Sequence, residues 1–138
     1  MLIRKNTKIF RAYNPFISLA LVPWYVANDQ TPFQIGMELN DRMREEPENT
    51  FVLIAMNGEK AEAILIAYIE TDHVHVWQAR KKSGFRYSGD MFAMLCQWSQ
   101  DNDISILQCA PAGHAQRRLY KRKYGFESID NKYMRKRL

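Results

Sequence analysis

Residues 51–69, which read FVLIAMNGEKAEAILIAYI, decide the fold of this chain. Two short apolar runs, 51–56 and 63–69, lie on either side of the pair Asn57-Gly58. An Asn-Gly pair between apolar runs is a strong hairpin signal, because the central residues of a tight hairpin turn need positive φ. The stretch therefore predicts two antiparallel strands that are neighbours in a sheet.

Strands and helices alternate in the rest of the chain after this hairpin. The expected elements are a strand from about Val74 to Lys81, a helix with Met91, Met94, Leu95 and Trp98 on one face, a strand at 104–109, a basic helix at about 111–124 and a final extended segment at 126–138. Gly125 suits the left-handed conformation that ends many helices.

The chain before the hairpin supplies an edge strand and two helices. The strand is expected within residues 1–13, and the apolar segment 15–27 is predicted to be a helix that Pro23 bends or ends. A second helix is expected to begin at Thr31 with a capping box that Gln34 completes. This order predicts one α/β domain over residues 1–138, with a mixed, mostly antiparallel sheet and helices on both faces.

Composition is typical of an ordinary globular domain. Of the 138 residues 46% are hydrophobic and 25% are charged, which excludes disordered and fibrous classes. Two cysteines form no disulfide framework, so we expect a reduced, cytoplasmic setting. The apolar segment 15–27 lacks the small residues of a signal-peptide cleavage site and is shorter than a bilayer span, so we expect no membrane association.

The net charge of +5 favours anionic partners such as nucleotides, the phosphates of a cofactor, or nucleic acid. Basic residues are concentrated from Arg117 onward. Such a run is most often a solvated face, and no recognisable nucleic-acid module accompanies it. Nucleic-acid binding through this segment is therefore a weaker alternative.

The element order and two segments resemble the GNAT superfamily, whose fold is that of acyl-CoA-dependent N-acetyltransferases. The first segment, Arg86-Tyr87-Ser88-Gly89-Asp90-Met91, resembles the family's Gln/Arg-x-x-Gly-x-Gly/Ala junction between the fourth strand and the next helix. The resemblance implies that these six residues hold the CoA pyrophosphate on backbone N–H groups at a helix N-terminus. It also implies that main-chain groups of Ala79, Arg80 and Lys81 pair with the pantetheine arm. Met91 stands where the family has Gly or Ala, and its side chain either crowds the pyrophosphate or points into the core.

The second segment, residues 119–126, resembles the family's late helix, which ends in Gly-Phe and carries a tyrosine that protonates the CoA thiolate. The family's tyrosine lies four residues before the glycine, where this chain has Lys121; Tyr120 lies five residues before Gly125. His114 stands where the family often has Asn.

The resemblance makes Tyr120 the candidate general acid, with acetyl-CoA as cosubstrate and an unidentified amine as acceptor. The alternative is a GNAT-fold binding or structural module without chemistry, like diverged GNAT-like proteins of bacteriophages. A monomer and a homodimer both remain open.

Two histidines and a cysteine are further candidates. His73 and His75 share one face of a strand, which is half of a metal site, but no third ligand follows at a recognisable spacing, so we expect no metal. His75 or Glu70 is a candidate base for the acceptor amine; the alternative for His75 is a half-buried histidine with a satisfied hydrogen bond. Cys109 is interpreted as a small buried hydrophobe.

Overall fold

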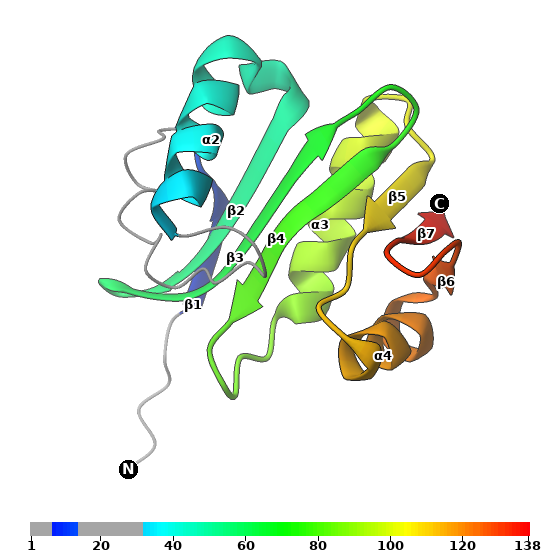
Figure 1. Cartoon of the computed structure of the whole chain (residues 1–138). Coiled ribbons are helices and arrows are strands. Elements are labelled where there is room, and N and C mark those ends of the chain that lie inside the picture. The colour runs from blue at the N-terminus through cyan, green and yellow to red at the C-terminus, as the bar shows by residue number, and fades with distance from the viewer. Residues whose placement is uncertain (1–6, 14–31) are drawn as a thin grey trace.

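The computed structural model describes residues 7–13 and 32–138. These residues form one seven-stranded sheet in the order β1-β2-β3-β4-β5-β7-β6 (Figure 1). The strands are β1 (Thr7–Arg11), β2 (Thr50–Asn57), β3 (Lys60–Ile69), β4 (Val74–Lys81), β5 (Ile106–Cys109), β6 (Glu127–Ser128) and β7 (Met134–Arg137). The β4–β5 pair is parallel and the other neighbours are antiparallel. The mixed, mostly antiparallel sheet is therefore confirmed.

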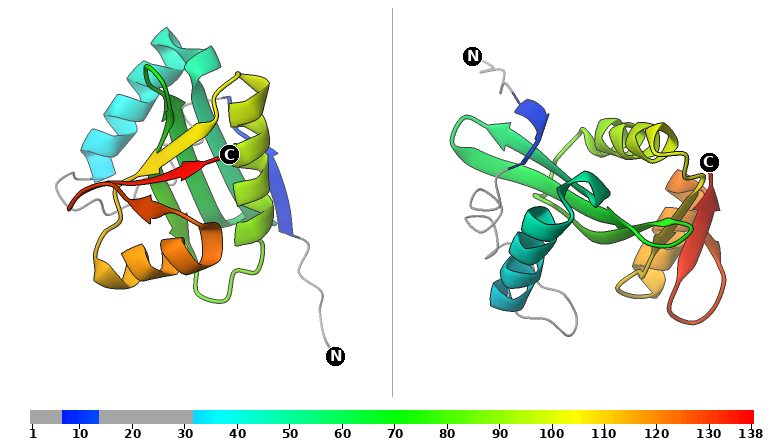
Figure 2. Two further views of the ribbon diagram at one scale, coloured as in Figure 1. Left: turned by 90° about the vertical axis from the view of Figure 1, so that its right-hand side faces the viewer. Right: turned by 90° about the horizontal axis from the view of Figure 1, so that it is seen from above.

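Helices cover both faces of the sheet, as the two turned views show (Figure 2). Helix α2 (Pro32–Glu45) lies on one face and α3 (Ser88–Asp101) on the other, while α4 (His114–Tyr124) follows β5. A short 3₁₀ turn, η2 (Pro47–Asn49), joins α2 to β2. Strand residues alternate between two cores: Val52 and Ile54 pack with Ile35 and Leu39 of α2, whereas Leu53 packs on the α3 side.

The hairpin forms where it was predicted, but its turn is one residue further along. Asn57 pairs with Lys60, so the two turn residues are Gly58 and Glu59. Gly58 has a φ of 60°, whereas the only non-glycine with positive φ in the described chain is Asp103. This turn needs positive φ only at its first central residue, and that residue is Gly58.

Other expectations need correction. Met94 of the predicted helix stripe is 39% exposed, while Met91, Leu95 and Trp98 are buried, because the buried stripe of α3 is narrower than the apolar pattern. The final segment is two antiparallel strands, β6 and β7, because Asp130 accepts hydrogen bonds from the backbone N–H groups of Lys132 and Tyr133 and so stabilises a turn. The predicted helix at 15–27 and the cap Thr31 lie outside the described residues.

Strands β4 and β5 separate partway along their length. They pair only from Val74 opposite Leu107 to Val76 opposite Cys109. Strand β4 then continues to Lys81, still paired with β3, while the chain after Cys109 leads to α4. Trp77 is the extra residue of a bulge at this point, since Val76 pairs with Ala67 and Gln78 pairs with Ile66. The sheet is therefore split next to a bulge, a combination that is common beside active sites.

Candidate active site

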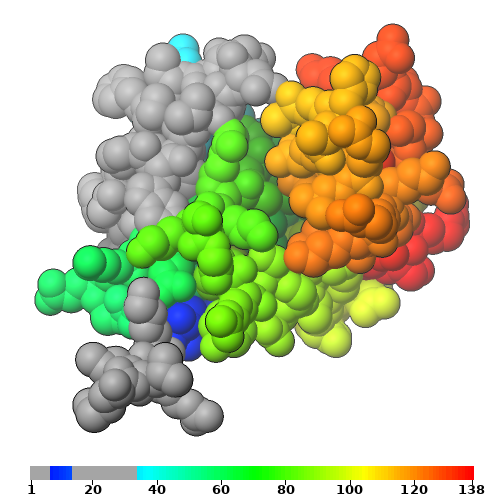
Figure 3. Space-filling model, turned by 90° about the horizontal axis from the view of Figure 1, so that it is seen from below, coloured from blue at the N-terminus to red at the C-terminus, as the bar shows by residue number. Residues whose placement is uncertain are grey.

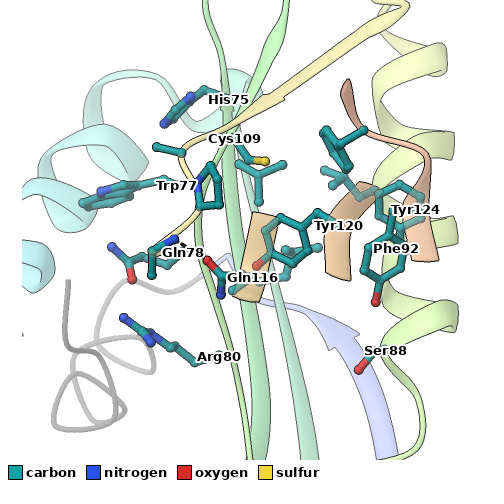
Figure 4. A pocket seen from close by; sticks show the side chains of 18 of the residues that line it. His75, Trp77, Gln78, Arg80, Ser88, Phe92, Cys109, Gln116, Tyr120 and Tyr124 are labelled. Carbon is teal, nitrogen blue, oxygen red and sulfur yellow. Dashed lines mark hydrogen bonds between the residues drawn. The ribbon is translucent and has the colours of Figure 1, made fainter. Parts of the chain in front are cut away.

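A cavity of about 980 Å³ occupies the split between β4 and β5. Its walls come from β4, the start of α3, the end of β5, α4 and the turn before β7. Seen from below, the surface is hollowed between the segment that joins β4 to α3 and helix α4 (Figure 3). Figure 4 shows the cavity with Tyr120 on one side of β4 and His75 and Trp77 on the other. The cavity therefore reaches both faces of the sheet.

The residues expected to pair with pantetheine line this cavity. Ala79, Arg80 and Lys81 lie on β4 beyond its last pair with β5, and all three belong to the cavity wall. The opposite edge of this part of β4 is paired with β3. The edge that faces the cavity therefore presents backbone donors and acceptors that β5 does not satisfy.

The N-terminus of α3 opens beside the cavity. Tyr87 is its N-cap residue and makes no side-chain capping bond, and the N–H of Met91 donates to the carbonyl of Tyr87 over 3.1 Å. The N–H groups of Ser88, Gly89 and Asp90 precede this first helical bond, so helix geometry gives them no intrahelical acceptor. A Cβ added to Gly89 would meet no atom within 4 Å. This turn of the helix therefore leaves backbone N–H groups that solvent or a ligand must satisfy.

The six residues of the predicted pyrophosphate segment divide into two groups. Ser88 and Met91 belong to the cavity wall. Arg86, Tyr87, Gly89 and Asp90 are exposed and lie outside the wall. Met91 is 5% exposed and packs in the core with Leu95 and Trp98. Of the two orientations open to Met91, the structure has the one that points into the core.

Tyr120 extends from α4 into the middle of the cavity (Figure 4). The Tyr124 and Phe126 rings each lie 6.1 Å from its own. Burial raises the pKa of Tyr120 to about 12, with Cys109 and Tyr124 adding to the shift and Arg80 opposing it. The phenol is therefore protonated at neutral pH and can donate a proton.

The end of α4 explains why Tyr120 reaches the cavity at an unusual spacing from the glycine. Gly125 has a left-handed φ of 76°, and the Phe126 N–H donates to the Tyr120 carbonyl over 3.3 Å. Lys121, at the family's usual position, is exposed and outside the cavity wall. His114 is the first residue of α4. The helix thus directs Tyr120, and not Lys121, into the cavity.

The two histidines of β4 and the preceding turn have different surroundings. His73 is buried, with Nδ1 2.8 Å from Asp72 Oδ1 and Nε2 3.3 Å from Glu70 Oε2, although the second contact is not aligned as a hydrogen bond. His75 lines the cavity, and burial lowers its pKa although Glu70 opposes the shift. Within the described ranges, no three His, Cys, Asp or Glu side chains gather as a metal site would require.

Cys109 lies at the end of β5, in the cavity wall. Burial raises the pKa of its thiol to about 12, and Arg117 opposes the shift. The thiol is therefore protonated at neutral pH, which makes it a weak nucleophile and fits the interpretation as a small buried hydrophobe.

The basic run after residue 116 is not one free surface. Arg117 donates to Ser128 Oγ and to the carbonyls of Asp130 and Asn131, which ties α4 to the β6–β7 turn. Arg135 donates to Gln108 Oε1 over 2.8 Å. Two of the basic side chains thus stabilise the fold.

Several residues of the cavity wall were missed in the sequence. They are Tyr68, Trp77, Gln78, Phe92, Gln116 and Tyr133. Trp77 and Gln78 are in the wall next to the bulge, and no local pattern signals a bulge inside an apolar strand. Tyr133 was missed because residues 126–138 were predicted as one extended segment, whereas the structure has a turn between β6 and β7.

No protein-family model matches the sequence, and no curated protein matches it. Solved structures do match. An acetyltransferase from Streptococcus agalactiae is 14% identical with a TM-score of 0.71 over 96% of this chain and 98% of its own. A GNAT-family acetyltransferase from Streptococcus pneumoniae is 16% identical with a TM-score of 0.66, over 96% of this chain and 100% of its own.

A third structure, PaiA N-acetyltransferase from Thermoplasma acidophilum in complex with coenzyme A, is 13% identical with a TM-score of 0.63, over 95% of this chain and 99% of its own. At such identities the likeness establishes the fold. The chain has the α/β fold of the GNAT acetyltransferases, as its element order and split sheet indicate. Among its described helices, none is long and apolar enough to cross a membrane.

Proposed function

We propose that this protein is an N-acetyltransferase that moves an acetyl group from acetyl-CoA to an amine. The observation that carries the proposal is the position of Tyr120, a half-buried, protonated phenol inside the cavity where β4 and β5 separate. The open N-terminus of α3 lies at the same cavity and offers N–H groups to a phosphate. The structural neighbour PaiA binds coenzyme A, which supports the same ligand here.

In the proposed reaction the bound acetyl-CoA lies along β4. Main-chain groups of Ala79, Arg80 and Lys81 would pair with the pantetheine arm. Within the segment from Arg86 to Met91, the N–H groups of Ser88, Gly89 and Asp90 would hold the pyrophosphate. The amine nitrogen forms a bond to the thioester carbonyl carbon, and the carbon–sulfur bond breaks. The leaving thiolate takes its proton from Tyr120, and His75 receives the proton that the amine loses. Most of the rate enhancement would come from positioning the two reactants.

His75 fits the role of base better than Glu70. It lies in the cavity wall, and its lowered pKa keeps it neutral at pH 7 and able to accept a proton. Glu70 is 46% exposed and lies against His73 instead. The two free thiols, Cys96 and Cys109, fit a reducing compartment, so we place the reaction in the cytoplasm.

Calorimetric titration with acetyl-CoA and with CoA tests the proposal. We expect saturable binding of both, followed by release of free thiol when an amine is added. Absence of binding at millimolar ligand would contradict the proposal. Binding without transfer to any amine would instead favour a GNAT-fold module that has lost its chemistry.

A further inference from the structure

The cavity has a side that the proposed cosubstrate does not use. Tyr68 on β3, His75 and Trp77 on β4, and Tyr133 in the turn before β7 line it, together with Glu38 of α2. Figure 4 shows His75 and Trp77 on the side of β4 that faces away from Phe92 and Tyr124. In a direct transfer, the acceptor must reach the thioester from a side that the cofactor leaves open. These residues therefore form the acceptor side.

Four rings on this side form one continuous aromatic wall, which consists of Trp77, Tyr68, His75 and Tyr133. The Trp77 and Tyr68 rings lie 6.2 Å apart, and Tyr68 and His75 lie 5.3 Å apart. His75 and Tyr133 follow at 6.2 Å. Trp77 lies two residues after His75 on β4, and residues two apart on a strand share a face (Figure 4). Three segments distant in sequence thus contribute rings that meet at interplanar angles of 45° to 78° and form one aromatic cluster.

Cations already lie on this wall. The Arg42 guanidinium is 3.7 Å from the centre of the Tyr68 ring, and Lys132 Nζ is 5.2 Å from the centre of the Tyr133 ring. These contacts show that the ring faces attract positive charge. Because Tyr68 and Tyr133 already have cationic partners, these two rings offer little to a further cation.

The charges of the lining argue against a polycationic acceptor. Within the described part of the chain, Glu38 is the one carboxylate of the wall, and its Oε1 is 3.4 Å from Arg42 Nη2. Of the basic lining residues, Lys132 lies at this side, against Tyr133, whereas Arg80 and Lys81 belong to the pantetheine side and Lys123 lies beside Tyr124. A ligand with several ammonium groups would meet Lys132 and one carboxylate that is already paired. A ligand with one amine on a flat apolar body would instead bury its ring against the aromatic wall.

We propose that the acceptor is a monoamine carried on an aromatic group, which stacks on the wall formed by Trp77, Tyr68, His75 and Tyr133 and places its nitrogen toward the thioester. This inference rests on the proposed function, and it selects aromatic monoamines over polyamines and amino sugars.

Ligand-observed saturation-transfer NMR with tryptamine and spermidine tests the inference on the intact protein, with and without CoA, and needs no turnover. We expect tryptamine to bind at least about tenfold more tightly than spermidine, the order of gain that burial of an aromatic ring against other rings supplies. Tryptophol, which keeps the ring but replaces the amine with a hydroxyl, should compete for the same surface. Equal or tighter binding of spermidine would overturn the inference.

Variants locate the binding surface. Trp77→Leu should weaken tryptamine binding about fivefold or more, and Tyr133→Leu, on an exposed turn, gives a second reading if the first variant folds poorly. Tyr13→Leu is the matched control, because Tyr13 is 72% exposed and outside the cavity wall. Unchanged tryptamine binding in both wall variants would overturn the inference.

The same amines separate this inference from the proposed function when acetyl-CoA is supplied. Acetylation of spermidine in preference to tryptamine would overturn the inference and leave the N-acetyltransferase standing. Tight binding of tryptamine at the wall without any acetyl transfer would contradict the proposed function alone.

Discussion

Val76 of β4 lies opposite Cys109 of β5, and this is the last pair between the two strands. Beyond it, β4 continues to Lys81 and the chain after Cys109 leads away to α4. A strand edge that loses its neighbour inside a domain has backbone groups that a ligand or water must satisfy. The pair therefore sets the point from which the cavity opens, and Tyr120 of α4 faces that point.

Gly89→Glu should abolish CoA binding while leaving the fold intact. Gly89 lies in the first turn of α3, and a Cβ there would meet nothing within 4 Å, so the side chain fits without disturbing the core. The added carboxylate would repel the pyrophosphate at the helix N-terminus. Calorimetry with CoA, accompanied by thermal melting, checks both parts.

Ala93→Glu is the control for this change, because Ala93 is exposed on the same helix and outside the cavity wall. It adds the same charge one turn away and should leave CoA affinity near that of the unmodified protein. Normal CoA affinity in a folded Gly89→Glu protein would show that the pyrophosphate binds elsewhere.

Met91→Ala should destabilise the protein by about 2–5 kcal/mol, as expected for a buried methionine whose removal leaves a cavity. Met91 is 5% exposed and packs with Leu95 and Trp98. Urea unfolding measures the loss. Met94→Ala is the control, since Met94 is 39% exposed and its truncation should change the free energy of unfolding by about 0.5 kcal/mol or less. Equal losses in the two variants would contradict the placement of Met91 in the core.

Most of the fold could be predicted from local patterns. The apolar runs around Asn57-Gly58 gave the hairpin, and the spacing of Leu95 and Trp98 gave the buried side of α3. These features depend on side-chain periodicity and turn chemistry, which are visible within a few residues. The exact turn position was wrong because Gly58 fits the first central position of a turn as well as the second, so the Asn-Gly pair does not fix the register.

The candidate site was only partly predictable. Tyr120 was named from a motif although its spacing to Gly125 differs from the usual one. The structure places it in the cavity wall, and its role as the acid stays a prediction. The aromatic wall of the acceptor side was missed, since Tyr68, Trp77 and Tyr133 are far apart in sequence and meet only through strand pairing and the β6–β7 turn. Long-range pairing of this kind has no local signal.

The protein should lose stability at alkaline pH in a way that Tyr120 and Cys109 help to set. Burial raises the pKa of Tyr120 from 10.0 to about 12 and that of Cys109 from 9.0 to about 12. Between pH 9.0 and about 12, the unfolded chain therefore releases protons that the folded protein retains. The contribution of these two groups to the free energy of unfolding should therefore be complete below pH 9 and should be lost as the pH rises toward about 12.

Tyr120→Phe should reduce the slope of this decline between pH 10 and about 12, because it removes one of the titrating groups. Urea unfolding at a series of pH values measures the slope. Tyr13→Phe, at a side chain that is 72% exposed, is the control and should leave the slope unchanged. A slope that Tyr120→Phe leaves unaltered would contradict the raised pKa of the phenol.

Tyr120→Phe should also lower kcat by at least about tenfold with little change in CoA affinity, because it keeps the ring and removes the proton. A positioned general acid typically contributes about 10²–10⁴ in rate. The measurement is thiol release from acetyl-CoA at saturating amine, with CoA affinity determined separately by calorimetry. A thiol has a pKa near 8.5, so a phenol with a raised pKa donates to the thiolate only if it is held close to the sulfur.

Tyr124→Phe is the matched control on the same helix. The Tyr124 ring packs 4.5 Å from Phe92, so its hydroxyl should matter little to the rate. A larger loss of kcat in Tyr124→Phe than in Tyr120→Phe would mean that the acid lies one turn further along α4. A normal rate in both variants would assign the proton to another group or to water.

Lys121→Ala completes the series and should leave kcat unchanged. One residue along a helix turns a side chain by about 100°, so the exposed Lys121 should contribute no proton to the sulfur.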